Sequence, residues 1–508
     1  MTETFYVTTP IYYVNGAPHL GHAYTSVAAD VAARWQRASG REVFFLTGTD
    51  EHGQKVEAAA RSAGLEPQAF TDKVSAEFKD MADKLDVSYD DYIRTTEPRH
   101  KAACAALWQA LAANGHIYLG GYEGWYAVRD EAFYDDGELI ERGGQRLAPT
   151  GAPVEWVREP SYFFRLSAFQ DRLLEYYASA EVIGPVSARN EILSFVKGGL
   201  HDLSISRTSF RWGIPVPGDA DHVMYVWLDA LTNYLTATGY PEPAAPRAKF
   251  WPADLHLVGK DIIRFHAVYW PAFLMAAGLP LPKRIFANGW WTVEGEKMSK
   301  SLGNVIDPRA LVAEFGVDPV RFFLLREIPF GNDGDFSRKA LIHRLNSELA
   351  NDLGNLAQRT LSLIARNCDG RLPPGLPPNA ADAALLEQLA GLPLAAGAAI
   401  ARQGFSDALE AAWRVIRAAN AYIDHQAPWA LKKTDLARMQ AVLRVLAEAL
   451  RTLGIVLRPF LPASMDRLLD QLGVAPQARD LAALDTRLAD GIVLPPPAGI
   501  FPRFVEPA

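Results

Sequence analysis

The chain has 508 residues, enough for about three domains of ordinary size, and 49% of them are hydrophobic. Its two cysteines, Cys104 and Cys368, exclude a disulfide framework and indicate a reducing, cytoplasmic setting. The formal net charge of −8 excludes a generally basic nucleic-acid binder, so an RNA partner needs a local basic surface. No apolar run reads as long enough to span a bilayer, and the start lacks a signal peptide. We therefore expect a soluble multidomain enzyme with no DNA or membrane partner.

Residues 1–115 alternate short apolar strands with amphipathic helices, and residues 222–325 repeat this pattern. A segment rich in Tyr, Trp and Gly, residues 116–221, lies between them. The predicted strands are Phe5–Thr9, Glu42–Thr47, Val223–Leu228, Leu255–Val258 and Arg284–Ala287. Such alternation is typical of α/β proteins, so we expect a Rossmann-like, doubly wound parallel sheet that is interrupted by an inserted connective domain.

Strand signals end near residue 336, and helical periodicity rich in Ala, Leu and Arg follows. We predict a connecting segment at 326–345 and an all-α helix bundle at 346–475. The tail, residues 476–508, is expected to pack back on the body of the protein.

A short motif, HLGH at residues 19–22, follows the first predicted strand. Pro18 suits the first position of a helix, which would place His19 and His22 on one face of the first turn. Free backbone N–H groups and the helix dipole attract phosphate there, and Gly21 would let a purine lie on the backbone. Alone the motif is weak, because histidines that hydrogen-bond to the core at a helix start give the same pattern.

A second motif is Lys297-Met298-Ser299-Lys300-Ser301. It follows a strand-like run, Trp290–Val293, and precedes Asp307-Pro308, a good N-cap and first helical residue. The motif is therefore predicted to lie on a loop between ordered elements. Two lysines and two serines on a loop can close over a triphosphate. A solvated basic loop is the alternative, and the pairing with HLGH makes it the less favoured one.

Together, in this order, the two motifs resemble the HxGH and KMSKS motifs of class I aminoacyl-tRNA synthetases. Longer segments resemble the methionyl-tRNA synthetase family in particular, and they extend over essentially the whole chain. They are PIYYVNG at 10–16, GTDEHG at 48–53, YVWLDA at 225–230, GKDIIRFH at 259–266, NLAQR at 355–359 and QAPW at 426–429.

The resemblance implies an enzyme that attaches methionine to initiator and elongator methionine tRNA in two steps. The methionine carboxylate attacks the α-phosphate of ATP, which enters with Mg²⁺, and gives methionyl-adenylate and pyrophosphate. The terminal ribose of the tRNA then attacks the carbonyl. The carboxylate is already ionised at neutral pH, so catalysis depends on positioning and on stabilising charge at the phosphates. The implied catalytic residues are His19, His22, Lys297 and Lys300, with Lys300 the largest contributor.

The resemblance also assigns binding residues. Those for ATP are Gly21, Gly259, Asp261, Ser299 and Ser301, with Asp261 receiving the ribose hydroxyls. Those for methionine are Ile11, Tyr13, Asp50, Trp227, Tyr234, Ile262, His266 and Trp270. Asp50 would hold the α-ammonium, and Tyr13 or His266 would donate a weak hydrogen bond to sulfur. Those for the anticodon are Asn355, Arg359 and Trp429, with Trp429 as a stacking platform. Ordinary core packing is the alternative for each aromatic residue.

Many relatives carry a zinc knuckle in the insertion. Here Ala127 and Asp130 stand where the first cysteine pair would be, and residues 141–155 contain no Cys or His. A structural zinc site needs about four thiolate or imidazole ligands, so we expect no metal site and no zinc. The additional C-terminal domain that dimerises some relatives is not found, so we expect a monomer.

Two other kinds of enzyme share part of this pattern. A cysteinyl enzyme of class I would use both motifs but relies on zinc-bound cysteines. A nucleotidyltransferase that builds a dinucleotide cofactor uses HxGH-type chemistry, but it would be much shorter and would not need the helix bundle. A non-catalytic RNA-binding relative would be expected to lose one of the motifs.

Overall fold

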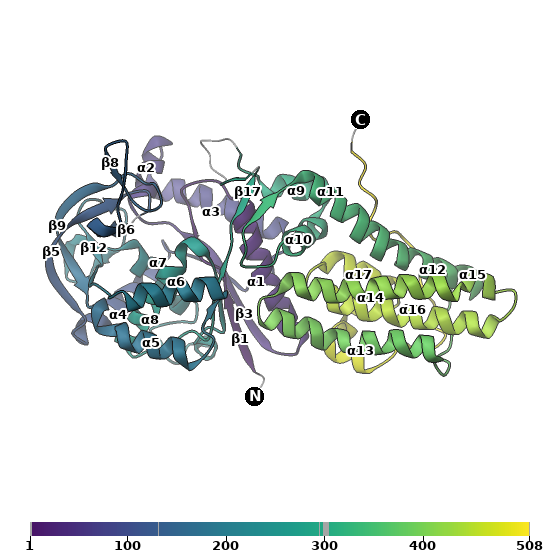
Figure 1. Cartoon of the computed structure of the whole chain (residues 1–508). Helices are drawn as coiled ribbons and strands as arrows, with labels where there is room; N and C mark the ends of the chain where they lie inside the picture. The colour runs from purple at the N-terminus through teal and green to yellow at the C-terminus, as the bar shows by residue number, and fades with distance from the viewer. Residues whose placement is uncertain (1–2, 131, 294, 298–303, 507–508) are drawn as a thin grey trace.

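A computed structural model describes residues 3–130, 132–293, 295–297 and 304–506. Figure 1 shows two lobes, an α/β body that carries the N-terminal strand and an elongated helix bundle. The predicted fold class is confirmed, because a parallel sheet with inserted antiparallel sheets precedes an α-helical domain.

The centre of the body is a seven-stranded parallel sheet of order β10-β16-β15-β1-β3-β2, with β4 also paired to β3. The strands are β1 (Thr4–Thr8), β2 (Tyr12–Tyr13), β3 (Glu42–Asp50), β4 (Asp91–Arg94), β10 (Ile183–Gly184), β15 (Leu255–Gly259) and β16 (Ile285–Asn288). Phe5 and Val7 of β1 join one core cluster and Tyr6 joins another, because successive side chains point to opposite faces. Both faces are buried, which explains the continuous apolar runs.

Helices cover the two faces of this sheet. The face of Val7 is covered by α1 (Leu20–Ala38) and α3 (Pro67–Lys84). The face of Tyr6 is covered by α4 (Pro98–Ala113), α7 (Val226–Thr236) and α8 (Trp270–Ala277). A further helix, α2 (Gln54–Ser62), follows β3.

The insertion contains antiparallel sheets of order β11-β9-β5-β6 and β12-β14-β13, and a β7-β8 pair. Its strands are β5 (Ile117–Ala127), β6 (Ala132–Tyr134), β7 (Ile140–Arg142), β8 (Gln145–Leu147), β9 (Glu155–Phe164), β11 (Leu203–Ser204), β12 (Ser206–Arg207), β13 (Pro215–Val216) and β14 (Asp219–Met224). Its helices are α5 (Gln170–Ser179) and α6 (Val186–Lys197). The two-residue strand β10 lies in the same stretch of chain but pairs with β16 of the main sheet.

The predicted strand Val223–Leu228 is wrong. Its first residues end β14, which is antiparallel, and α7 begins at Val226. A short apolar run such as Val-Trp-Leu suits a buried helix as well as a buried strand, so periodicity could not separate the two.

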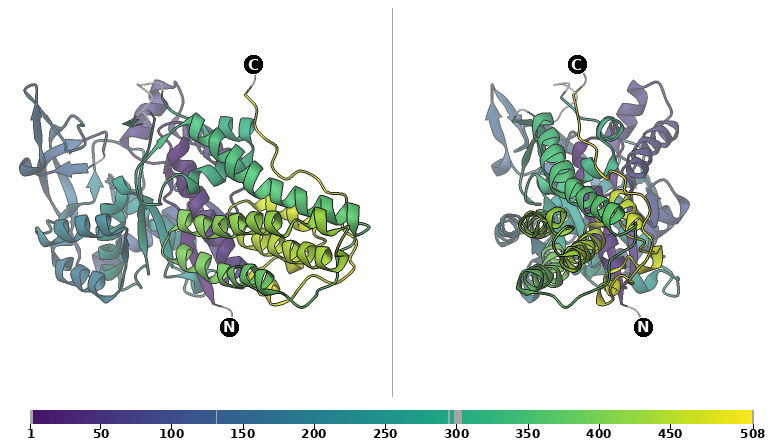
Figure 2. Two further views of the ribbon diagram at one scale, coloured as in Figure 1. Left: turned by 45° about the vertical axis from the view of Figure 1, so that its right-hand side comes forward. Right: turned by 90° about the vertical axis from the view of Figure 1, so that its right-hand side faces the viewer.

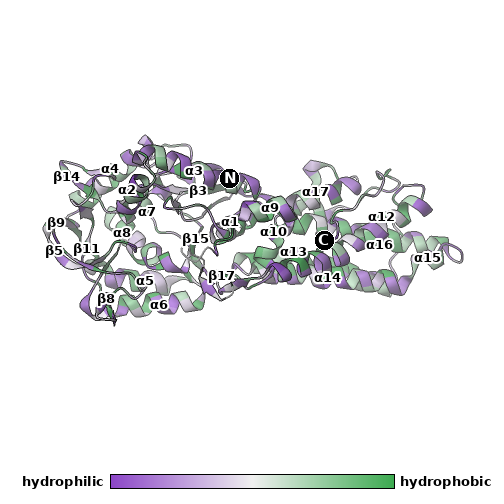
Figure 3. Cartoon of the chain, turned by 90° about the horizontal axis from the view of Figure 1, so that it is seen from above, coloured by the Kyte–Doolittle hydropathy of each residue, from purple (hydrophilic) through white to green (hydrophobic). Residues whose placement is uncertain are grey.

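Helices connect the body to the bundle and then form it. The connecting helices are α9 (Pro308–Phe315), α10 (Val317–Arg326), α11 (Arg338–Arg344) and a π-helix (Leu345–Gly354). The bundle helices are α12 (Asn355–Asn367), α13 (Ala380–Ala401), α14 (Phe405–Gln426), α15 (Pro428–Leu431), α16 (Leu436–Leu457) and α17 (Pro462–Gln471). Hydrophobic and hydrophilic residues alternate along these helices in Figure 3, as amphipathic helices require.

The C-terminal tail runs back from the bundle toward the connecting helices (Figure 2). The Phe504 ring lies 4.7 Å from that of Phe315 on α9. The side chain of Asn346 donates to the carbonyl of Phe504 at 3.0 Å and accepts its N–H at 2.8 Å.

One bundle helix corrects the expectation about membrane-spanning runs. By length and composition alone, α13 is apolar enough to cross a bilayer. Its Leu385, Leu389 and Leu392 are buried in the bundle core, and the helix contacts α14 and α16. Alanine residues and the exposed Leu394 raise its mean hydropathy, so this is weak evidence for a membrane span.

Candidate active site

Several of the predicted site residues that the structure describes lie at the carboxyl ends of the central strands, where doubly wound sheets bind ligands. β3 ends at Asp50, and β15 ends at Gly259, two residues before Asp261. β2 extends the sheet beside the end of β3 and places Tyr13 opposite Asp50. HLGH lies between β2 and the body of α1, near the middle of Figure 1.

The two histidines of HLGH cap the start of α1. His19 is the N-cap residue, and its Nδ1 accepts the backbone N–H of Gly21 at 3.1 Å. Nδ1 of His22 accepts the backbone N–H of His19 at 3.1 Å, which completes a reciprocal capping box. The predicted helix start at Pro18 is therefore wrong. The helix begins at Leu20 because the His19 side chain itself acts as the cap.

The protonation of this pair follows from the same bonds. Because each Nδ1 is an acceptor, each ring carries its proton on Nε2. Burial and the neighbouring His19 hold the pKa of His22 well below its usual value, so His22 is neutral near pH 7. The rings lie 3.7 Å apart between centroids. His22 therefore offers a phosphate a hydrogen bond instead of a positive charge.

The second motif begins on a hairpin of β17 (Trp291–Val293) and β18 (Glu296–Lys297), with β19 (Gly334–Phe336) beside β17. A carboxylate of Asp335 fixes its turn, accepting the Thr292 hydroxyl at 2.7 Å and the Gly295 N–H at 2.9 Å. Lys297 is described only as the last residue of β18. Ser299, Lys300 and Ser301 lie outside the described residues. After the motif, Asp307 caps α9 as predicted.

Asp261, the predicted ribose ligand, is held at the edge of the sheet. Its Oδ1 accepts from Nε1 of Trp290 at 3.2 Å. Lys260 lies 4.1 Å over the Trp290 ring and pairs with Asp333 at 2.6 Å. A Cβ on Gly259 would lie 2.6 Å from Asp261 Oδ1, so a larger residue there would force the Asp261 carboxylate to move. Sequence reasoning missed Trp290, Lys260 and Asp333 as neighbours of the site, because they share no local pattern.

Tyr234 and His266 form the polar end of a buried aromatic group. Tyr234 Oη lies 2.8 Å from His266 Nε2, and His266 Nδ1 lies 2.9 Å from the carbonyl oxygen of Ile262. A carbonyl only accepts, so Nδ1 carries the proton and Nε2 accepts from the tyrosine hydroxyl. Burial lowers the pKa of His266 to about 4, so the ring is neutral at pH 7. This geometry argues against His266 as a donor to sulfur and leaves the hydroxyl of Tyr13 as the other expected donor.

Other aromatic rings extend this group. The Trp227 ring stacks on Phe265 with centroids 3.7 Å apart and meets His266 edge-on at 6.2 Å. Trp270 lies 6.0 Å from Tyr234. Ile11, Tyr13 and Ile262 are half-buried and pack against the same core cluster. Phe265 is a residue that sequence reasoning missed. It lies on a π-helix, Phe265–Tyr269, whose register an ordinary helical period does not reveal.

The positions of the missing zinc ligands are filled by an apolar cluster. Ala127, Ala148 and Ala152 are fully buried together. Beside them, Asp130 accepts from the hydroxyls of Tyr134 and Thr150. Buried methyl groups and one occupied carboxylate do not fit the ligand set of a structural zinc.

The predicted anticodon residues meet at the far end of the bundle. Asn355 and Arg359 lie one turn apart on α12, and Asn355 is exposed. The Arg359 guanidinium lies 5.4 Å over the Trp429 ring and pairs with Asp424 at 2.5 Å. Trp429 is 43% exposed, because Ala427 adopts a left-handed conformation that ends α14. The alternative that Trp429 packs inside the bundle is therefore wrong.

Comparison with known proteins gives full-length matches. The chain matches the family model "tRNA synthetases class I (M)" over residues 5–143 and 146–361, and "Anticodon binding domain of methionyl tRNA ligase" over residues 372–507. It is 55% identical to the methionine–tRNA ligase of Mesorhizobium japonicum, over 99% of this chain and 98% of that relative. Identity to the Rickettsia felis ligase is 56%, over 99% of each chain. A structure of Mycobacterium tuberculosis methionyl-tRNA synthetase with methionyl-adenylate is 51% identical, with a TM-score of 0.97, over 99% of this chain and 100% of that one.

Proposed function

The chain belongs to the class I methionyl-tRNA synthetases, and from this premise we propose how its residues join methionine to tRNA. The enzyme is a methionine–tRNA ligase, and its reaction passes through methionyl-adenylate. One observation carries the assignment of residues. The histidine cap of α1, Asp50, Asp261 and the Tyr234–His266 pair converge on one edge of the parallel sheet.

In the first step the methionine carboxylate attacks the α-phosphate of ATP, and pyrophosphate leaves. His19 and His22 donate their Nε2–H groups to phosphate oxygens as charge develops there. Lys297 and Lys300 supply the positive charge that a neutral His22 does not. Ser299 and Ser301 add hydrogen bonds to the phosphates. Asp261 and Gly259 hold the ribose, and Gly21 leaves room for the base.

ATP enters as its Mg²⁺ complex. Mg²⁺ keeps several waters and is bound mainly by phosphate oxygens, so it does not require a cage of protein carboxylates. Among the described residues at this edge, Asp333 is paired with Lys260 and Asp335 holds the hairpin turn. The phosphate oxygens of ATP would hold the ion, which would supply positive charge against the charge that passes to pyrophosphate.

Methionine lies between Asp50 and the aromatic group. Asp50 binds the α-ammonium, and Tyr13 beside it on the sheet closes one wall. The flexible thioether contacts Trp227 and Trp270. The Tyr234 hydroxyl donates a hydrogen bond to His266, so a methionine sulfur would compete with His266 for this bond. The Tyr13 hydroxyl is the second donor to the sulfur. Leucine has no lone pair to accept such a bond, which favours methionine.

The anticodon of methionine tRNA binds at the far end of the bundle. A base of the anticodon loop of the tRNA stacks on the Trp429 ring, and the exposed amide of Asn355 forms hydrogen bonds with the edge of a base. Arg359 contributes a planar guanidinium that the Asp424 carboxylate already orients. With the alanine cluster in place of a knuckle, the enzyme works without zinc, and we propose that it acts as a monomer.

The experiment that tests the assignment is Asp50→Asn in steady-state pyrophosphate exchange. Loss of one charge-assisted hydrogen bond should raise the methionine KM about 10- to 100-fold and leave the ATP KM within about twofold. Asp221→Asn is the matched control. Asp221 is exposed, and its ion pair with Arg211 is loose, with 3.9 Å between the charged atoms. An unchanged methionine KM for Asp50→Asn would show that another group holds the ammonium.

A further inference from the structure

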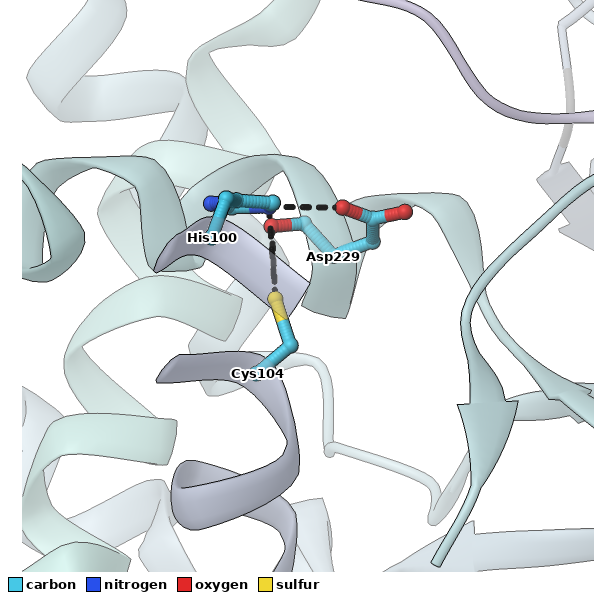
Figure 4. A group of neighbouring side chains, drawn as sticks. All are labelled: His100, Cys104 and Asp229. Carbon is cyan, nitrogen blue, oxygen red and sulfur yellow. Dashed lines mark hydrogen bonds and ion pairs between the residues drawn. The ribbon is translucent and has the colours of Figure 1, made fainter. Parts of the chain in front are cut away.

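A buried carboxylate lies directly behind the methionine site. Asp229 on α7 is 1% exposed, and its Oδ2 lies 2.7 Å from Nδ1 of His52. Its Oδ1 lies 2.8 Å from Nε2 of His100 on α4. Figure 4 shows His100 and Cys104 pointing from α4 toward Asp229. Burial acts to raise the pKa of this carboxyl, but the two histidines outweigh it and hold the pKa below its usual value. Asp229 is therefore an anion that accepts from both rings.

His52 belongs to the loop that presents Asp50. The loop runs from the end of β3 to Gly53 and is fixed on its other sides. Trp212 Nε1 donates to the carbonyl of Glu51 at 2.6 Å, and Gly53 donates its N–H to the carbonyl of Trp212 at 2.9 Å. The Glu51 carboxylate is held by Arg94 at 2.6 Å. The bond from His52 to Asp229 ties this loop to α7.

The other end of that contact carries the side-chain pocket. α7 bears Trp227 about half a turn before the buried carboxylate and Tyr234 about one and a half turns after it. One buried hydrogen bond to a carboxylate thus connects the loop of Asp50 with the helix of the aromatic residues. A displacement of about 1 Å between reacting or binding groups is enough to cost an enzyme about 100-fold.

We propose that Asp229 and His52 are positioning residues that fix the distance between the ammonium-binding and side-chain-binding halves of the methionine site. The proposal rests on the assignment of Asp50 to the α-ammonium and of Trp227 and Tyr234 to the side chain. Neither Asp229 nor His52 needs to touch methionine. His100 anchors the same carboxylate to α4, away from the loop, so its loss should affect stability and not methionine binding.

A metal ion is the competing explanation for this cluster. One atom each of His100, Cys104 and Asp229 lies within 4.8 Å of the others. However, Nε2 of His100 lies 2.8 Å from the carboxylate and 3.2 Å from the sulfur. Ligands around a tetrahedral zinc with bonds of about 2.0 Å stand about 3.3 Å apart or more. Burial also raises the pKa of the Cys104 thiol, whereas a metal requires the thiolate. The distances between His100, Cys104 and Asp229 and the protonated thiol therefore indicate a hydrogen-bonded network and not a metal site.

The test compares His52→Ala, His52→Asn and His100→Ala in the full-length enzyme. Loss of the His52 bond should raise the methionine KM about tenfold, with the ATP KM within about twofold. The asparagine amide can replace Nδ1 as a donor to Asp229, so His52→Asn should restore most of the wild-type KM. His100→Ala should lower the melting temperature and leave the methionine KM within about twofold of wild type.

Each other outcome overturns the inference. An unchanged methionine KM for His52→Ala, or equal changes in both KM values, would show that the network is only structural. One tightly bound metal ion per chain that is lost in Asp229→Asn would assign the cluster to a metal. Asp50→Asn in the same assay separates this inference from the proposed function. If Asp50→Asn raises the methionine KM and His52→Ala does not, the positioning role fails and the binding site stands.

Discussion

Replacement of Trp429 by alanine tests the tRNA-binding end of the molecule. The ring is 43% exposed, and its main described polar contact is the Arg359 guanidinium at 5.4 Å. An exposed cation–π contact is worth about 0.5–1 kcal/mol, so loss of this contact should cost no more than about 1 kcal/mol of stability. A base stacked on an aromatic ring contributes about 1–3 kcal/mol, which corresponds to about a 5- to 150-fold loss of affinity. The main effect of the variant should therefore be weaker tRNA binding, and the free energy of unfolding should change less.

The assay pairs tRNA charging with methionine-dependent pyrophosphate exchange at the same enzyme concentration. Trp429→Ala should cut kcat/KM for tRNA by about tenfold or more and leave exchange near normal. Trp156→Ala is the matched control, because Trp156 is 52% exposed on β9 of the insertion. Equal losses in both assays, or a large drop in melting temperature, would show that Trp429 is structural. A similar charging defect in Trp156→Ala would refute the location of the anticodon site.

Three further predictions concern the body of the enzyme. Lys300→Ala should slow single-turnover adenylate formation far more than it weakens methionine binding, because the charge is needed where the phosphate transition state develops, and near-normal adenylate formation would refute the role of the loop. Metal analysis of purified enzyme should find no stoichiometric zinc, since alanines fill the knuckle position, and one zinc per chain that resists mild chelation would contradict this. Acid should destabilise the fold through His266. Its pKa is lowered to about 4 by burial, whereas the unfolded chain takes up the proton near pH 6.5, so the unfolding free energy should fall by about 3 kcal/mol between those values. Denaturant unfolding of His266→Gln across this range should show a shallower decline, and an unchanged slope would mean that His266 is not buried as a neutral ring.

The main sheet could be predicted where burial leaves a strong local signal. Thr4–Thr8, Leu255–Gly259 and Ile285–Asn288 are apolar runs buried on both faces, and such runs stand out in a sequence. β10 has two residues and could not be seen. The start of α7 was ambiguous because Val226-Trp227-Leu228 fits a helix or a strand equally well.

The candidate site also has features that the sequence predicts and features that only the folded chain shows. HLGH and the residues at strand ends are short and local, so their positions could be read from the chain. The His52–Asp229 bond joins residues 177 apart in sequence, and no local pattern marks either as a partner of the other. The tautomer of His266 likewise depends on a carbonyl and a hydroxyl that only the folded chain brings to its two nitrogens. Protonation and orientation are tertiary properties, and residue type alone could not determine them.

The most direct test of the central claim is ATP–pyrophosphate exchange by the purified enzyme, measured with each of the amino acids in turn. We expect exchange with methionine and none above background with leucine or cysteine, because the site combines an ammonium-binding carboxylate with aromatic walls and hydroxyl donors for a thioether. Exchange driven equally well by leucine or cysteine, or no exchange with methionine, would contradict this assignment of the site.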